Sequence, residues 1–94
     1  MNNYEVLYIL PANLSEEAAA AQIDKYSALV TSSGGEVEKV DKWGVKKFAY
    51  PIDFKTEGNY VLMTFKASSS LPLEMERQMK LSDEIIRYML VNKD

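Results

Sequence analysis

The chain has 94 residues, of which 47% are hydrophobic, and it carries a formal net charge of −3 with no cysteine and no histidine. This length predicts one domain, residues 1–94, built around a single hydrophobic core. The missing residue types exclude disulfides, thiolate metal sites, histidine bases and Ser-His-Asp or Cys-His nucleophiles, so we expect no cofactor; no apolar run approaches the ~18 residues of a transmembrane helix, so we expect no membrane partner.

Residues 4–10 predict the first strand, because they are rich in Val, Leu, Ile and Tyr and end at Pro11. Apolar side chains occur at both parities of this segment. One face carries Tyr4, Val6, Tyr8 and Leu10, and the other carries Leu7 and Ile9. A strand that is apolar on both faces is typical of the middle of a sheet.

The first helix is predicted to begin after Ser15 and to run to about Ser32. Ser15 is a favourable N-cap, and two glutamates follow it where the helix dipole favours negative charge. Gly34 and Gly35 then provide the C-terminal stop. Apolar residues at helical spacing form the expected buried stripe, which consists of Ala19, Ile23, Tyr26 and Val30.

A long second strand is predicted over residues 36–52. Its apolar phase shifts along the segment, which indicates a bulge, and Gly44 is the expected position. Pro51 cannot donate to a strand ladder, so this strand should lie at an edge. Residues 53–59 are polar and predict a hairpin loop, and residues 60–67 predict a third strand that is again apolar on both faces.

The second helix is expected to be capped by Ser70, to carry Pro72 in its first turn and to end at residues 82–83. Met75 and Met79 are one turn apart and should face the core. Residues 84–92 predict the last strand. Its faces should carry Ile86, Tyr88 and Leu90 on one side, and Ile85, Arg87, Met89 and Val91 on the other.

The order strand, helix, strand, strand, helix, strand predicts an α+β protein with the ferredoxin-like split βαβ fold. Four antiparallel strands should lie in the order 4-1-3-2, with both helices on one face. The first and third strands, which are apolar on both faces, are the two that this topology places in the middle. The second strand is then an edge.

Residues 43–52 of this edge combine basic and aromatic side chains in an unusual way. Lys46 and Lys47 are adjacent and lie among Trp43, Phe48 and Tyr50. Residues 39–55 hold five lysines against two aspartates, a local charge of +3, while the remainder of the chain carries −6. A compact basic zone can meet a few phosphates. Alternatively, these lysines only keep an edge strand soluble.

The segment Gly44-Val45-Lys46-Lys47-Phe48-Ala49-Tyr50-Pro51-Ile52 resembles the signature of the bacterial small-subunit ribosomal protein S6 family. Phe48 replaces the usual leucine, and Asp53 departs from the closing position. The opening residues 3–6 and residues 36–40 also resemble the family, and the similarity extends over essentially the whole chain.

The resemblance implies a structural component of the bacterial small ribosomal subunit, in the cytoplasm, and not an enzyme. It implies binding to 16S ribosomal RNA together with ribosomal protein S18, with no small-molecule substrate. RNA helices are recognised mainly through backbone and shape, and unpaired bases by stacking on aromatic rings. The candidate RNA- or partner-binding residues are Tyr4, Lys39, Lys42, Trp43, Lys46, Lys47, Tyr50 and Arg87.

Two alternatives use the same fold, because fold alone does not determine function. A generic single-strand RNA-binding module of the RNA-recognition-motif type is suggested by Gly58, Tyr60 and Phe65, although Glu57 stands where that motif has a basic residue. A small dimeric ligand-binding or enzyme domain would need paired carboxylates or a perturbed lysine. The adjacent acidic pair at residues 83–84 more simply marks a turn between helix and strand.

Overall fold

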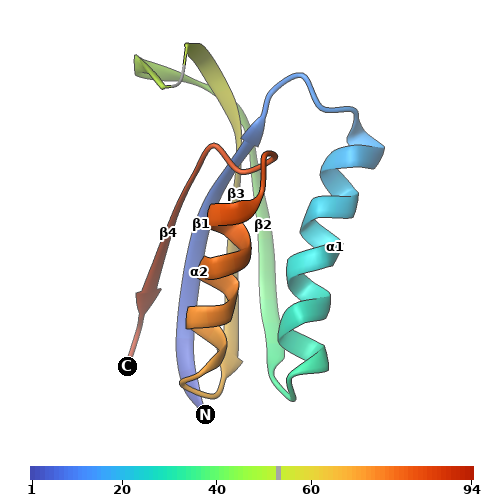
Figure 1. Cartoon of the computed structure of the whole chain (residues 1–94), viewed down its shortest axis with the longest axis vertical. Coiled ribbons are helices and arrows are strands. Elements are labelled where there is room, and N and C mark those ends of the chain that lie inside the picture. Colours follow the sequence, from blue (N-terminus) through green and yellow to red (C-terminus); the bar gives the residue numbers. More distant parts are fainter. Residues whose placement is uncertain (53) are drawn as a thin grey trace.

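The structure is a computed structural model that describes residues 1–52 and 54–94. Its elements are β1 (Asn2–Pro11), α1 (Glu16–Ser32), β2 (Glu36–Ile52), β3 (Lys55–Ala67), α2 (Leu71–Leu81) and β4 (Arg87–Asn92). The antiparallel sheet has the order β2-β3-β1-β4, and both helices cover the same face (Figure 1). This is the predicted ferredoxin-like fold, with the predicted strand order 4-1-3-2 named from the opposite edge.

The core lies between the two helices and the inner faces of the central strands. The predicted stripe of α1 is buried, and Met75 and Met79 of α2 are 0% and 1% exposed. The predicted N-cap is also confirmed, because the Ser15 hydroxyl accepts a hydrogen bond from the Ala18 N–H at 3.1 Å. The strands contribute Tyr4, Val6, Tyr8 and Leu10 from β1, and Val61, Met63, Phe65 and Ala67 from β3.

Strand β2 contains the predicted bulge and two further irregularities. The pairing with β3 shifts between Lys42 and Gly44, and the backbone of Gly44 has φ of +87°, which favours glycine. A second shift lies between Val37 and Lys39, and a third between Lys47 and Ile52. Each bulge adds one residue to β2 and reverses the side of the sheet that the next side chain occupies.

The hairpin between β2 and β3 is tighter than the sequence predicts. Residues 55–59 were expected in a loop, but they belong to β3, and Lys55 pairs with Ile52. Their polarity arises because this part of the two-stranded ribbon extends beyond the helices into solvent, not because the backbone leaves the sheet (Figure 1). The predicted loop began at residue 53, which lies outside the described residues.

The segment around α2 differs from expectation in two details. Ser70 makes no capping side-chain bond; its hydroxyl instead lies 3.0 Å from the hydroxyl of Ser68. Strand β4 begins at Arg87 rather than at residue 84, and Ile85 rather than Ile86 packs against the core. The turn before Arg87 does not keep strand alternation, so the predicted parity fails there.

Candidate functional site

The sheet surface opposite the helices, here called the open face, is not covered by any helix of the described residues. Strand register determines which side chains share it. Leu7 of β1 pairs with Leu62 on one side and Met89 on the other. Met89 and Val91 are 62% and 42% exposed. We call the following residues of the open face the apolar strip: Leu7, Ile9, Leu62, Met89 and Val91.

An aromatic and basic cluster adjoins this strip on β2 and β3. Trp43 stacks on Tyr60, with ring centroids 6.4 Å apart and an interplanar angle of 12°. Phe48 meets Tyr60 edge-on at 6.2 Å. The Lys46 Nζ lies 5.1 Å from the centre of the Trp43 ring, a cation–π contact worth about 0.5–1 kcal/mol at an exposed site. We call these four residues the aromatic corner.

The bulge and one glycine explain how this cluster forms. Trp43 is the extra residue between the paired positions Lys42 and Gly44, so its side chain is released from regular alternation beside Tyr60. A Cβ at Gly58 would collide with Ile9 Cγ2 and lie 2.8 Å from Phe48 Cζ. Glycine at position 58 therefore gives Phe48 the room to lie against the open face.

The predicted lysines divide between the two sides of β2. Lys46 lies opposite Gly58 on the open face, and Lys47 lies opposite Glu57 on the other side. Both lysines are exposed.

The two preceding lysines divide in the same way. Lys39 lies opposite Thr64 on the open face, where its Nζ is 3.8 Å from Asp41 Oδ2. Lys42 lies opposite Val61 and lines a hollow beside α1. The basic zone is thus a rim around β2 and not one flat patch.

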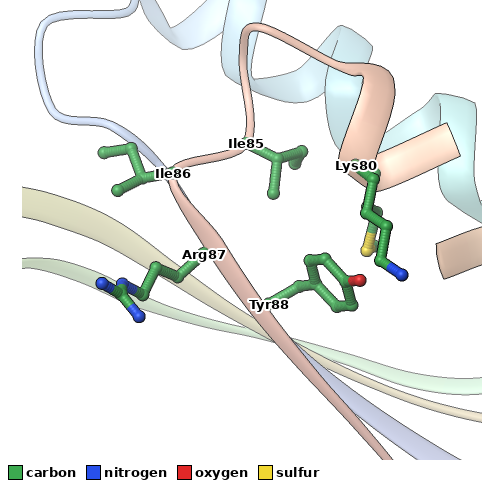
Figure 2. A pocket seen from close by; sticks show the side chains of 6 residues that line it. Lys80, Ile85, Ile86, Arg87 and Tyr88 are labelled. Atoms are coloured by element: carbon green, nitrogen blue, oxygen red, sulfur yellow. The ribbon is translucent and has the colours of Figure 1, made fainter. Parts of the chain in front are cut away.

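The other predicted residues have different surroundings. Arg87 pairs with Ile9 on the open face, and Figure 2 shows that it leaves β4 on the side opposite Tyr88, whose ring points toward Lys80 at the end of α2. Tyr4 is only 5% exposed, with its ring 5.6 Å from that of Phe65 in the core. We therefore leave Tyr4 out of the surface proposed below.

Tyr50 is 81% exposed near the end of β2. Its expected alignment with Lys46 assumed a regular strand, whereas the register shifts between Lys47 and Ile52. Sequence reasoning also missed Phe54, which is fully exposed at the hairpin tip. The apolar strip was missed as a site, although apolar side chains on both faces of the central strands were its signal.

The perturbed ionisable groups lie in the core or on other surfaces. Burial raises the pKa of Tyr8 and of Tyr26, whose rings pack against each other at 5.5 Å. Hydrogen bonds from Arg77 and Gln78 lower the pKa of Glu74 to about 2. The described residues contain no group of three or more side chains suited to hold a metal ion, and no helix among them is long and apolar enough to cross a membrane.

Known proteins resemble this chain along nearly its whole length. The profile of the family described as "Ribosomal protein S6" matches residues 3–92. Small ribosomal subunit protein bS6 of Clostridium novyi is 47% identical, over 100% of this chain and 99% of the relative. The bS6 protein of Moorella thermoacetica is 42% identical, over 96% of this chain and 92% of the relative.

A solved structure agrees with these sequence relatives. The crystal structure of 30S ribosomal protein S6 from Thermotoga maritima has a TM-score of 0.92 and 27% identity, and the match covers 98% of this chain and 87% of that one. The names of the relatives are those of a ribosomal component and not of an enzyme. The chain belongs to the ribosomal protein S6 family of the small ribosomal subunit.

Proposed function

We propose that this protein is a non-catalytic component of the small ribosomal subunit in the cytoplasm, which binds 16S ribosomal RNA together with ribosomal protein S18. One observation carries the proposal: the open face joins an uncovered apolar strip to a basic and aromatic corner. The two surfaces differ in chemistry, and each suits a different partner. The family match over residues 3–92 favours this function over a generic RNA module or an enzyme.

The aromatic corner and the β2 rim suit RNA. Lys46, Lys47 and Arg87 supply exposed positive charge for phosphates, and Trp43 is 43% exposed beside them. The protein as a whole carries −3, so only a few phosphates can be neutralised. We therefore expect weak binding to RNA by this protein alone and strong binding once S18 is present.

The apolar strip suits a protein partner. Exposed apolar residues that lie next to one another on a sheet face mark interaction surfaces more often than isolated ones do. Met89 and Val91 are the most exposed members, and Leu7 connects them to the centre of the sheet. Burial of this strip by S18 would bring the basic side chains of both proteins to one RNA surface.

A binding assay with a fragment of the 16S RNA central domain tests this function. Affinity is measured for this protein alone, S18 alone and both together, across a range of salt concentrations. Replacing Lys46 and Lys47 by alanine should weaken the joint complex and reduce the slope of log affinity against log salt by about 0.7–0.9 per lost phosphate contact. Lys80→Ala, on α2, serves as a matched control.

Two results would contradict the proposal. Tight binding by this protein alone with a steep salt slope would remove the need for S18. An equal loss for Lys80→Ala and for the double variant would show that general charge, and not the β2 rim, determines binding. Thermal melts should change little for the double variant, since both lysines are exposed and such substitutions cost within about 0.5 kcal/mol.

A further inference from the structure

The tip of the β2–β3 hairpin presents an aromatic ring to solvent. Phe54 is 102% exposed, and its backbone has φ of +64°. A left-handed backbone favours glycine or asparagine, and a large apolar side chain there has no stabilising contact within the fold. The neighbouring pairing of Ile52 with Lys55 positions the ring at the end of a two-stranded ribbon.

A hollow of about 260 Å³ lies beside this ring. Figure 1 shows that the hairpin end and the connection from β1 to α1 lie at the same end of the sheet. The hollow is formed between these two segments. Its lining consists of Pro11, Ala12 and Asn13 from the connection, and Phe54, Lys55, Thr56 and Glu57 from the hairpin.

We propose that this hollow receives one unpaired base of ribosomal RNA, stacked on Phe54, with an adjoining phosphate at Lys55. The proposal rests on the RNA-binding function proposed above and adds a specific contact to it. Every base has a flat face that stacks on an aromatic ring, so an exposed phenylalanine recognises unpaired nucleotides without reading their sequence.

The chemistry of the lining favours a nucleotide over an apolar peptide side chain. Beside one aromatic ring the hollow offers an ammonium, a hydroxyl and an amide, from Lys55, Thr56 and Asn13. These groups match the phosphate, sugar and base edge of a nucleotide. The carboxylate of Glu57 also lines the hollow, where it can accept a hydrogen bond from an amino group of a base.

Substitutions at position 54 separate stacking from simple hydrophobic contact. Phe54→Leu keeps an apolar side chain but removes the ring, and Phe54→Trp enlarges the ring. In the joint complex with S18 and the 16S central-domain fragment, Phe54→Leu and Phe54→Ala should both lower RNA affinity by roughly 5- to 100-fold. Phe54→Trp should retain or increase it. The salt slope should stay that of the wild type, because stacking releases no phosphate counterions.

A second variant checks the phosphate contact. Lys55→Ala should weaken binding and should lower the salt slope by about 0.7–0.9, the change for one phosphate. Binding of each variant to S18 without RNA is measured in parallel. Wild-type affinity for S18 in every variant is the expected result, since the tip is separate from the apolar strip.

Each other outcome overturns the inference in a distinct way. Equal RNA affinity of wild type and Phe54→Leu, with the wild type still binding, would remove the stacking contact and leave the proposed function intact. Loss of S18 binding in Phe54→Ala but not in Phe54→Leu would assign the ring to a protein pocket. Absence of RNA binding by the wild-type complex would refute the proposed function itself. Because Phe54 is fully exposed, thermal melts of the variants should match the wild type.

Discussion

Gly58→Ala tests how tightly the open face is packed around the aromatic corner. The new Cβ would collide with Ile9 Cγ2 and lie 2.8 Å from Phe48 Cζ. Ile9 is β-branched and sits in the pairing between β1 and its neighbours, so its methyl group moves only with its rotamer. Overpacking of this kind costs about 1–3 kcal/mol.

An opposing gain must be subtracted. Alanine is better than glycine in the middle of a strand by roughly 0.5–1 kcal/mol. The net expected loss in the free energy of unfolding is therefore about 0.5–2 kcal/mol, and each kcal/mol lowers the melting temperature of a domain of this size by about 4–8 °C. Urea denaturation and a thermal melt measure it directly.

A double-mutant cycle identifies the cause of the loss. In an Ile9→Ala background the closest obstacle is absent, so Gly58→Ala should cost less there than in the wild type, with a coupling of at least about 0.5 kcal/mol. A melting temperature that is unchanged or raised in the single variant would refute the packing argument. A loss of equal size in both backgrounds would show that Ile9 is not the obstacle.

Three further predictions concern other parts of the molecule. Ser15→Ala removes the acceptor for the Ala18 N–H and should lower the free energy of unfolding by about 0.5–2 kcal/mol in urea denaturation, while Ser15→Asp should restore most of it. Glu74 should titrate near pH 2 by NMR, because its pKa is lowered mainly by the hydrogen bond from Arg77; its contribution to stability is then present above the ordinary glutamate pKa and lost as pH falls toward 2, and Arg77→Ala should return the midpoint to the ordinary range. Met89→Glu places a charge in the apolar strip and should weaken binding to S18 at least tenfold by calorimetry with little change in melting temperature, whereas an unchanged affinity would locate the S18 contact elsewhere.

Local patterns predicted most of the fold because they agree with its tertiary contacts. The helical stripe of α1, the central positions of β1 and β3 and the bulge at Gly44 all followed from apolar spacing. The polar residues 55–59 were misassigned because they resemble a loop in composition, and only pairing with β2 makes them strand. The parity of Ile85 failed for a similar reason, since a turn before Arg87 interrupts the alternation.

The candidate site was predictable in composition but not in geometry. Lysines next to aromatic residues in β2 were visible in the sequence, and the family resemblance supplied their probable partners as an expectation. The side of the sheet that each lysine occupies depends on bulges whose positions need the partner strand. The burial of Tyr4 did follow from the sequence, because it shares parity with Val6 and Tyr8 of the core face. The exposure of Phe54 depends on how far the hairpin extends.

The two bulges of β2 restrict which length changes this strand tolerates. Each bulge exchanges the faces, so the side chains that follow Gly44 recover the alternation found before Val37 only because there are two of them. Deleting one residue at either bulge would turn Lys46 toward the helices and Lys47 toward the open face. Insertions or deletions in residues 37–44 should therefore survive only in compensating pairs, while the hairpin tip, which sets no register for another strand, can change its length one residue at a time.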